Sequence, residues 1–239
     1  MSTATATSTF TLTETTQRVL KNFAQISTSL LLREGTEQKT VNASKSVLAI
    51  AQLPTPWPQE TAVYQLPELL SNLSAYANPV LEFEEKNFII RGTNSPSHVV
   101  YPYSDPSVVM AAPNKTFDVS NPVAQFTLPE KAVAEIKKLS AINNLPTIVI
   151  ESNSDKGTIV VKPHDEKNPA SRVYSYPVHA DKGSITTLTG GTFAFKFKRE
   201  HFDLLMDGGY TVSIGNWPYA YFQHVTEPVS YFVVQASNK

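Results

Sequence analysis

The chain contains no cysteine among its 239 residues. This absence excludes disulfide frameworks, thiolate zinc sites and cysteine nucleophiles. Apolar runs long enough to span a bilayer are also lacking, and the first ten residues, MSTATATSTF, have neither the basic start nor the apolar core of a secretory signal. We therefore expect a protein that is made and kept in a cytoplasm and has no membrane partner.

Neither sign of charge dominates the chain. It has 20 Lys and Arg against 21 Asp and Glu, which gives a formal net charge of -1 at pH 7. A protein of this balance exerts no strong overall attraction on nucleic acid or on a membrane. Any site for a polyanion would require basic residues to be gathered on one face.

Recognisable catalytic and metal-binding patterns are missing as well. None of the five histidines stands three or four residues from another on an expected helix, and no G-x-S-x-G elbow, P-loop or dinucleotide fingerprint occurs. The compact cluster of His164, Asp165 and Glu166 lies in an expected loop, where a solvated role is favoured over a metal site. We expect no enzymatic activity, no cofactor and no metal, although an active site assembled from distant residues stays open.

A proline-rich stretch in the middle of the chain, SHVVYPYSDPSVVMAAPNKTF, divides it into two halves. Its first residues are β-branched or aromatic, which predicts a strand, and the prolines that follow predict an extended connector. The connector has an apolar segment at residues 108–110, which either packs on the neighbouring domain or offers a surface to a partner. We predict an N-terminal domain over residues 1–110, a connector over 111–122 and a C-terminal domain over 123–239.

The same order of elements occurs four times along the chain, at a spacing of roughly sixty residues. Each unit has a strand, then an amphipathic helix, then several strands. Three helices are expected over residues 14–27, 66–76 and 199–206. A further helix, third in chain order, is expected to start at a capping box of Thr127 and Glu130 and to run to Ile142. This order predicts an α+β protein of two similar domains, each a duplicated unit. Chance order in a generic α+β protein is the alternative.

Three of the four expected helices have basic residues opposite their apolar arc. A solvated helix face would explain any one of them, but the repetition favours sequence-independent contact with phosphates. The basic residues concerned are Arg18, Lys21, Lys131, Lys137, Lys138, Arg199 and His201.

Two stretches resemble a known family. LKNFAQIS in the first helix and YPYSDPSVVMAAPNK in the central stretch are similar to the sliding clamps of T-even-type bacteriophages, the processivity factors of their DNA polymerases. The order of elements matches from about Thr13 to Ala236. The resemblance implies a homotrimeric ring with helices lining the hole and sheets outside, in the cytoplasm of an infected bacterial host. The implied partners are duplex DNA, a DNA polymerase and an ATP-driven clamp loader.

The resemblance also implies roles for particular residues. The seven basic residues would face the DNA, with Arg199 and His201 the least certain, and the second helix would add no positive charge. Edge strands would close the ring through Val99, Val100, Val173 and Tyr174. Partner peptides would bind a pocket formed by Val108, Val109, Met110, Phe117 and Tyr231. Such clamps also assist late transcription, and the residues carry no sign of whether this chain does.

A second hypothesis comes from another class of protein. A ring-forming phage structural protein of the virion, with two related domains, shares the repeats, the oligomer and the lack of catalytic motifs. It would have no need for basic helix faces. Neutralising the basic residues of the third helix therefore distinguishes the two hypotheses.

Overall fold

The computed structural model describes residues 8–153, 157–168, 170, 172, 174–179, 184–189 and 191–236. The chain folds into two compact units, the first formed by residues 1–45 and 49–113 and the second by residues 46–48 and 114–239. None of the helices in the described ranges combines the length and the apolar character that crossing a bilayer requires.

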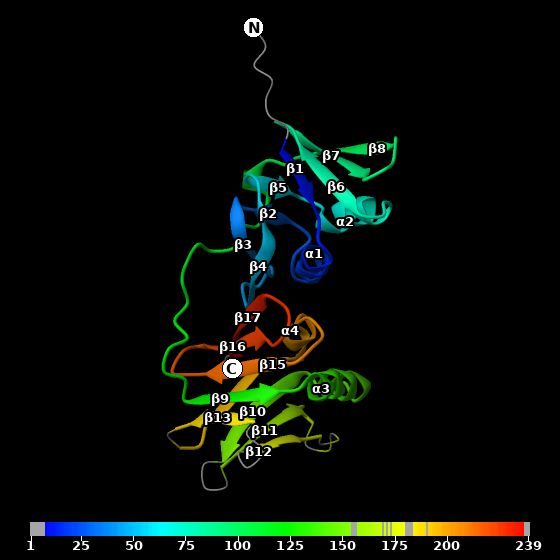
Figure 1. Ribbon diagram of the computed structural model, residues 1–239. Helices are drawn as coiled ribbons and strands as arrows, with labels where there is room; N and C mark the ends of the chain where they lie inside the picture. The colour runs from blue at the N-terminus through cyan, green and yellow to red at the C-terminus, as the bar shows by residue number, and fades with distance from the viewer. Residues whose placement is uncertain are drawn as a thin grey trace. The chain divides into compact units, whose positions relative to one another are not determined.

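The first unit begins with a strand, a helix and three strands, and then repeats that order (Figure 1). Strands β1, β6, β7 and β8 form an antiparallel sheet in the order β1-β6-β7-β8, β2 pairs with β5, and β3 pairs with β4. The elements are β1 Ser8–Thr11, α1 Glu14–Ile26, β2 Leu30–Leu32, β3 Gly35–Val41, β4 Val47–Trp57, β5 Thr61–Val63, α2 Leu66–Ser74, β6 Pro79–Phe83, β7 Asn87–Gly92 and β8 His98–Pro102.

An aromatic cluster forms the core beside this sheet. Trp57 is only 1% exposed and lies edge-on to Phe10, Phe83 and Phe88, with ring centroids 4.9 to 6.1 Å apart. Edge-to-face packing suits the charge distribution of aromatic rings and adds to the free energy gained by burying them. The cluster joins β1, β4, β6 and β7 into one body.

The second unit has the same order with one additional strand, β13. Its sheets run in the orders β12-β11-β10-β14 and β13-β9-β15-β16-β17. The elements are β9 Ala124–Leu128, α3 Glu130–Ile142, β10 Thr147–Asn153, β11 Thr158–His164, β12 Tyr176–His179, β13 Ile185–Leu188, β14 Ala194–Lys198, α4 Arg199–Asp203, β15 Tyr210–Ile214, β16 Tyr219–His224 and β17 Val229–Val234.

Aromatic rings also fill the core of the second unit. Phe197 of β14, Phe202 of α4 and Phe222 of β16 are fully buried and lie 5.9 to 6.1 Å apart between centroids. Helices α3 and α4 pack against each other beside the strands (Figure 1). The predicted α+β class is therefore confirmed, with four α-helices and antiparallel strands in the described part of the chain.

Two predictions for the first unit were wrong. The largely polar sequence of residues 35–41 predicts a connection between strands, but these residues form β3, in which Gln38 and Thr40 are buried. The Gln38 amide donates to the carbonyls of Arg33 and Gly35, so its N–H groups keep hydrogen-bond partners when the side chain is buried. The sequence PTPWP at residues 54–58 predicts a turn, but strand β4 continues through Pro54. The next proline is two residues on, so both missing N–H groups lie on one edge of the strand.

Three boundaries in the second unit also differ from expectation. Helix α4 ends at Asp203 rather than at 206. Thr127 does not cap α3, because it belongs to β9 and Pro129 takes the capping position. The sequence of residues 172–176 favours a strand, but β12 begins only at Tyr176.

Candidate nucleic-acid interface

Helix α1 carries two of the predicted basic residues. The Thr13 Oγ1 accepts a hydrogen bond from the Thr16 N–H at 3.1 Å and fixes the first turn, while the apolar side of the helix is buried. On the other side, the Arg18 side chain is 47% exposed, and its guanidinium lies 3.8 Å from the Glu14 carboxylate. Lys21 is exposed one turn further on. Such a loose surface ion pair can exchange for contact with a phosphate.

Helix α3 supplies two further exposed cations, Lys131 and Lys138. The helix buries Ala132, Val133 and Ile136 against the second unit, and this periodicity turns the two lysines outward. Among the described residues, neither lysine has an ion pair within 4.0 Å. Their ammonium groups are therefore available to a polyanion.

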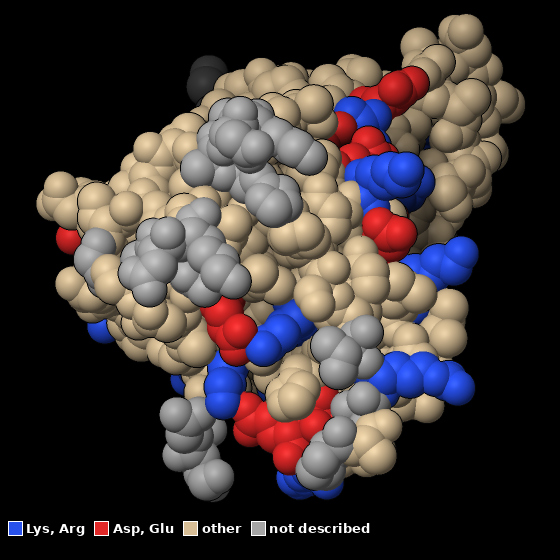
Figure 2. Space-filling model, turned by 90° about the horizontal axis from the view of Figure 1, so that it is seen from below, with Lys and Arg blue, Asp and Glu red and all other residues tan. Residues whose placement is uncertain are grey.

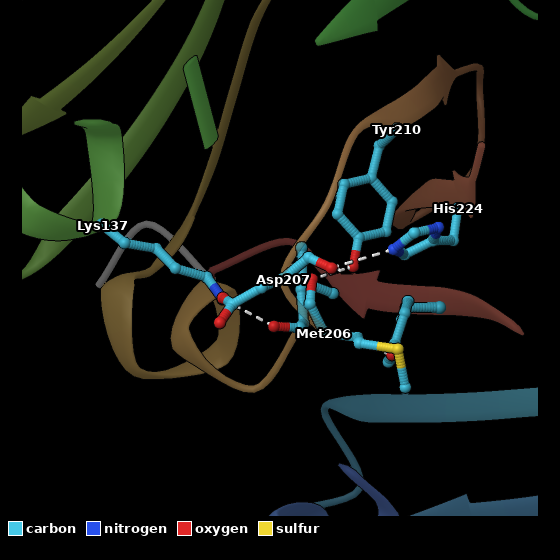
Figure 3. Close-up of polar contacts among 7 residues, drawn as sticks. Lys137, Met206, Asp207, Tyr210 and His224 are labelled. Atoms are coloured by element: carbon cyan, nitrogen blue, oxygen red, sulfur yellow. Dashed lines mark hydrogen bonds and ion pairs between the residues drawn. The ribbon is translucent and has the colours of Figure 1, made fainter. Parts of the chain in front are cut away.

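Lys137 differs from its neighbours on α3. Its side chain is only 17% exposed, and its ammonium donates to the carbonyl oxygen of Leu205 at 2.6 Å and to the Asp207 carboxylate at 2.9 Å (Figure 3). These contacts hold the side chain on the turn that follows α4. Lys137 therefore offers less of its charge to solvent than Lys131 and Lys138 do.

Helix α4 contributes one basic group at its surface. The Arg199 side chain is 30% exposed and lies 3.7 Å from the Asp203 carboxylate. Burial raises the pKa of Asp203, while Arg199 and then Lys137 act in the opposite direction. Arg199 is thus a partly neutralised cation.

The prediction that His201 faces DNA does not fit the structure. His201 is 6% exposed, and burial lowers the pKa of its imidazole. A buried neutral ring supplies no positive charge at pH 7 and does not reach a ligand in solvent. The basic character of its neighbours in the sequence gave no indication that its side chain points into the core.

Helix α2 adds no cation, as expected. Its polar side chains donate to the helix's own carbonyls: Ser71 to Pro67 at 2.9 Å and Asn72 to Glu68 at 3.0 Å. These donors are occupied within the helix and are not directed at an anion. Any positive surface on the helices therefore comes mainly from α1 and α3.

Charge on the face of the molecule drawn in Figure 2 is interspersed rather than continuous. Figure 2 shows basic side chains lying beside acidic ones, with uncharged surface around them. In the second unit, an open cavity of about 850 Å³ follows the same pattern, with Lys196 and Lys198 paired to Glu166 and Glu200. Interspersed charge of this kind favours weak contacts with a polyanion over tight binding.

The predicted interface residues occupy the edge of a sheet in the first unit. Val99 and Val100 lie on β8, which pairs with β7 on one side and, in the described part of the chain, has no partner strand on the other. The Val100 side chain is 56% exposed. An unpaired strand edge with an exposed apolar residue is suited to pairing with another chain.

In the second unit, the corresponding edge strand is β12. Tyr174 precedes this strand rather than belonging to it, and burial together with the nearby Glu135 raises the pKa of its hydroxyl to about 12. Val173 lies outside the described residues. The edge itself is therefore formed by Tyr176–His179.

The apolar connector segment is partly exposed. Val108 is 56% exposed and Met110 37%, whereas Val109 is 7% exposed. The Met110 N–H donates to the Ser29 Oγ at 3.2 Å, so this segment is fastened to the first unit. Val108 and Met110 can meet a partner, while Val109 anchors the segment.

The two other residues predicted for the peptide pocket lie in the second unit. Phe117 packs on Tyr219 and Phe232, with ring centroids 5.7 and 4.9 Å away. Tyr231 is fully buried, and its hydroxyl accepts a hydrogen bond from the Met206 N–H. The prediction that Tyr231 lines the peptide pocket was therefore wrong, because a fully buried core residue does not line a pocket at the surface.

Two further findings concern metals and the residues that the sequence did not single out. No group of three or more metal-binding side chains occurs among the described residues. Asp207, the partner of Lys137, went unnoticed because seventy positions separate the two residues. No local pattern in the sequence predicts a contact between residues so far apart in the chain.

Comparisons with known proteins place these features in context. No family model matches the chain. It is 28% identical over 208 residues to the sliding clamp of Vibrio phage KVP40, covering 85% of this chain and 89% of that protein. Its structure is similar to the Proliferating Cellular Nuclear Antigen from Entamoeba histolytica, with a TM-score of 0.70 and 11% sequence identity. The match covers 96% of this chain and 98% of the other chain. It is also similar to the PCNA2–PCNA3 complex from Sulfolobus tokodaii, with a TM-score of 0.68 and 9% sequence identity. That match covers 95% of this chain and 99% of the other chain.

Proposed function

Because the chain is a homologue of a phage sliding clamp and has the fold of the PCNA proteins, we propose that it encircles duplex DNA and tethers a DNA polymerase. The similarity to the sliding clamp of Vibrio phage KVP40 confirms the resemblance noted in the sequence. As a member of this non-enzymatic class, the chain is a processivity factor and not an enzyme, as expected.

One observation in the structure carries the proposed mode of DNA contact. Exposed basic side chains stand on the faces of α1 and α3 opposite their buried residues, in a protein whose net charge is only -1. Arg18, Lys21, Lys131 and Lys138 are the groups concerned. Helices of this kind contact phosphates without reading bases.

The weakness of these contacts suits sliding. A lysine that contacts a phosphate displaces a counterion and can exchange quickly with the next phosphate. Few cations per helix, with acidic groups interspersed, keep each position on the duplex nearly equal in free energy. The ring then moves along DNA while topology prevents it from leaving.

We further propose that three copies close a ring through β8 of one subunit and β12 of the next. Among the strands that the structure describes, each of these two leaves one edge unpaired in its sheet. Antiparallel pairing between subunits would satisfy their backbone groups. An ATP-driven loader would open and close this ring, and the site of action would be the cytoplasm of an infected bacterium.

Neutralising two lysines of α3 tests the proposed DNA contact. We expect Lys131→Gln with Lys138→Gln to reduce polymerase stimulation several-fold at moderate salt. The log–log slope of DNA affinity against salt should fall by about 0.9 for each lost contact. Primer-extension assays with the loader, together with fluorescence anisotropy on duplex DNA, measure both effects.

A matched control separates position from charge. Lys86 and Lys115 are exposed in loops, so Lys86→Gln with Lys115→Gln removes the same charge away from the helices. The control pair should retain full stimulation. Equal loss in both pairs, or no loss in either, contradicts DNA contact through α3 and favours a structural protein of the virion.

The apolar connector segment is proposed to bind a peptide from the polymerase. We expect Val108→Ser with Met110→Ser to lower the affinity for such a peptide more than tenfold, since burying each side chain contributes about 1.5 to 3 kcal/mol. Fluorescence polarisation with the C-terminal peptide of the phage polymerase measures the change. Val119→Ser with Val225→Ser, also at exposed positions, should leave binding unchanged. Unchanged affinity in the first pair would remove the peptide-binding role from this segment.

A further inference from the structure

The turn that receives Lys137 is fixed by the strands around it (Figure 3). The Met206 N–H donates to the Tyr231 hydroxyl at 3.2 Å, and the Met206 carbonyl accepts from the Tyr210 hydroxyl. The carbonyl of Asp207 lies 3.1 Å from His224 Nε2. Three strands, β15, β16 and β17, thus hold the backbone of residues 206 and 207 in place.

The imidazole of His224 has a defined role in this arrangement. Its Nδ1 accepts hydrogen bonds from the N–H groups of Thr226 at 3.1 Å and Glu227 at 3.0 Å. An atom that accepts two backbone N–H groups carries no proton, so the proton sits on Nε2 and is donated to Asp207. The turn is therefore fastened by a neutral histidine.

This fixed turn presents Asp207 to Lys137. The Asp207 carboxylate is 92% exposed, while the Lys137 side chain is 17% exposed. The lysine therefore lies down on the turn, and the carboxylate faces water on its other side. An ion pair with one partner in water is weak, so it can open when a competing anion approaches.

We propose that Asp207 is a positioning residue that holds Lys137 back from DNA phosphates and so limits the grip of α3 on the duplex. This inference rests on the proposed function as a DNA clamp. Lys131 and Lys138 contact phosphates freely, while Lys137 exchanges between the turn and the DNA. The contact with Asp207 thereby keeps DNA affinity low enough for the ring to slide.

The first test measures the accessibility of Lys137 without DNA. Brief labelling of the intact protein with an amine-reactive ester, read by mass spectrometry, should modify Lys137 several-fold more slowly than Lys131 and Lys138. Asp207→Ala should raise the labelling rate of Lys137 and leave the other two rates unchanged. Equal rates for all three lysines in the wild-type protein would overturn the proposal.

The second test measures DNA binding by fluorescence anisotropy on a short duplex over a range of salt concentrations. We expect Asp207→Ala to tighten binding several-fold and to steepen the log–log salt slope by about 0.9 for each lysine released. Glu130→Ala removes one negative charge from α3 itself and is the matched control. It should change binding much less, because Glu130 has no lysine partner within 4.0 Å among the described residues.

A double variant separates release of Lys137 from a general change in charge. In a Lys137→Gln background, Asp207→Ala should have no larger effect than Glu130→Ala. If the gain from Asp207→Ala persists without Lys137, or equals that of Glu130→Ala, the inference is overturned. If the wild-type protein shows no salt-dependent binding at all, the proposed function fails, and the inference loses its basis with it.

Discussion

Replacing Gly208 with alanine should lower the free energy of unfolding of the second unit by about 3 to 5 kcal/mol. Gly208 has φ +145°, and a Cβ there would lie 2.2 Å from Nε2 of His224. His224 is buried and holds three backbone groups, so it cannot move aside without losing those hydrogen bonds. Urea unfolding followed by circular dichroism measures the loss.

Gly191→Ala is the matched control for this prediction. Gly191 also has positive φ, at +87°, but no atom of the residues described by the structure lies within 4 Å of the position of an added Cβ. The control therefore carries the backbone strain without the clash and should cost about 1 kcal/mol. Equal losses in the two variants would show that strain alone accounts for the effect and that His224 is free to move.

The amphipathic helices were the most predictable part of the fold. In α1 and α3, apolar residues recur at helical spacing and are buried, and the order of one strand, one helix and several strands holds in all four repeats. Periodicity reports burial reliably where the buried residues are apolar. The α+β class and the repeated order follow from it.

Strand β3 was missed because two of its three buried positions, Gln38 and Thr40, are polar. Gln38 looks like a solvated residue in the sequence, but it serves the backbone of the tight turn before it. The early end of α4 has a similar cause: Leu205 is buried beyond it, and the backbone of Met206 bonds to Tyr210, four residues on, and to Tyr231 of β17. Such contacts are set by tertiary structure, so local patterns do not reveal them.

The candidate site shows the same division. That α1 and α3 expose basic residues was predictable, because the face opposite an apolar arc is solvated. The difference in exposure between Lys137 and Lys138 was not predictable, because it depends on the contact of Lys137 with Asp207 in a distant turn. The burial of His201 likewise depends on how a helix of five residues packs, and so short a helix has too little periodicity to assign a face.

Replacing Val100 with lysine should convert the proposed trimeric ring into monomers and abolish polymerase stimulation. Val100 is 56% exposed on the edge strand β8, where pairing with β12 of another subunit would cover it. A lysine covered without a partner costs about 3 kcal/mol or more per interface, which weakens association at least about 100-fold. Light scattering across a dilution series measures the native mass, and primer extension measures stimulation.

Val100→Thr is the control, because threonine has nearly the same shape and favours strands equally. It should leave the trimer largely intact, while the Val100→Lys monomer should keep the circular-dichroism spectrum of a folded protein, since the side chain is exposed in the isolated subunit. A Val100→Lys protein that stays trimeric at every concentration would show that β8 does not close the ring. A wild-type protein that is monomeric throughout would remove the self-closing ring from the proposed function, because no topological tether would then exist.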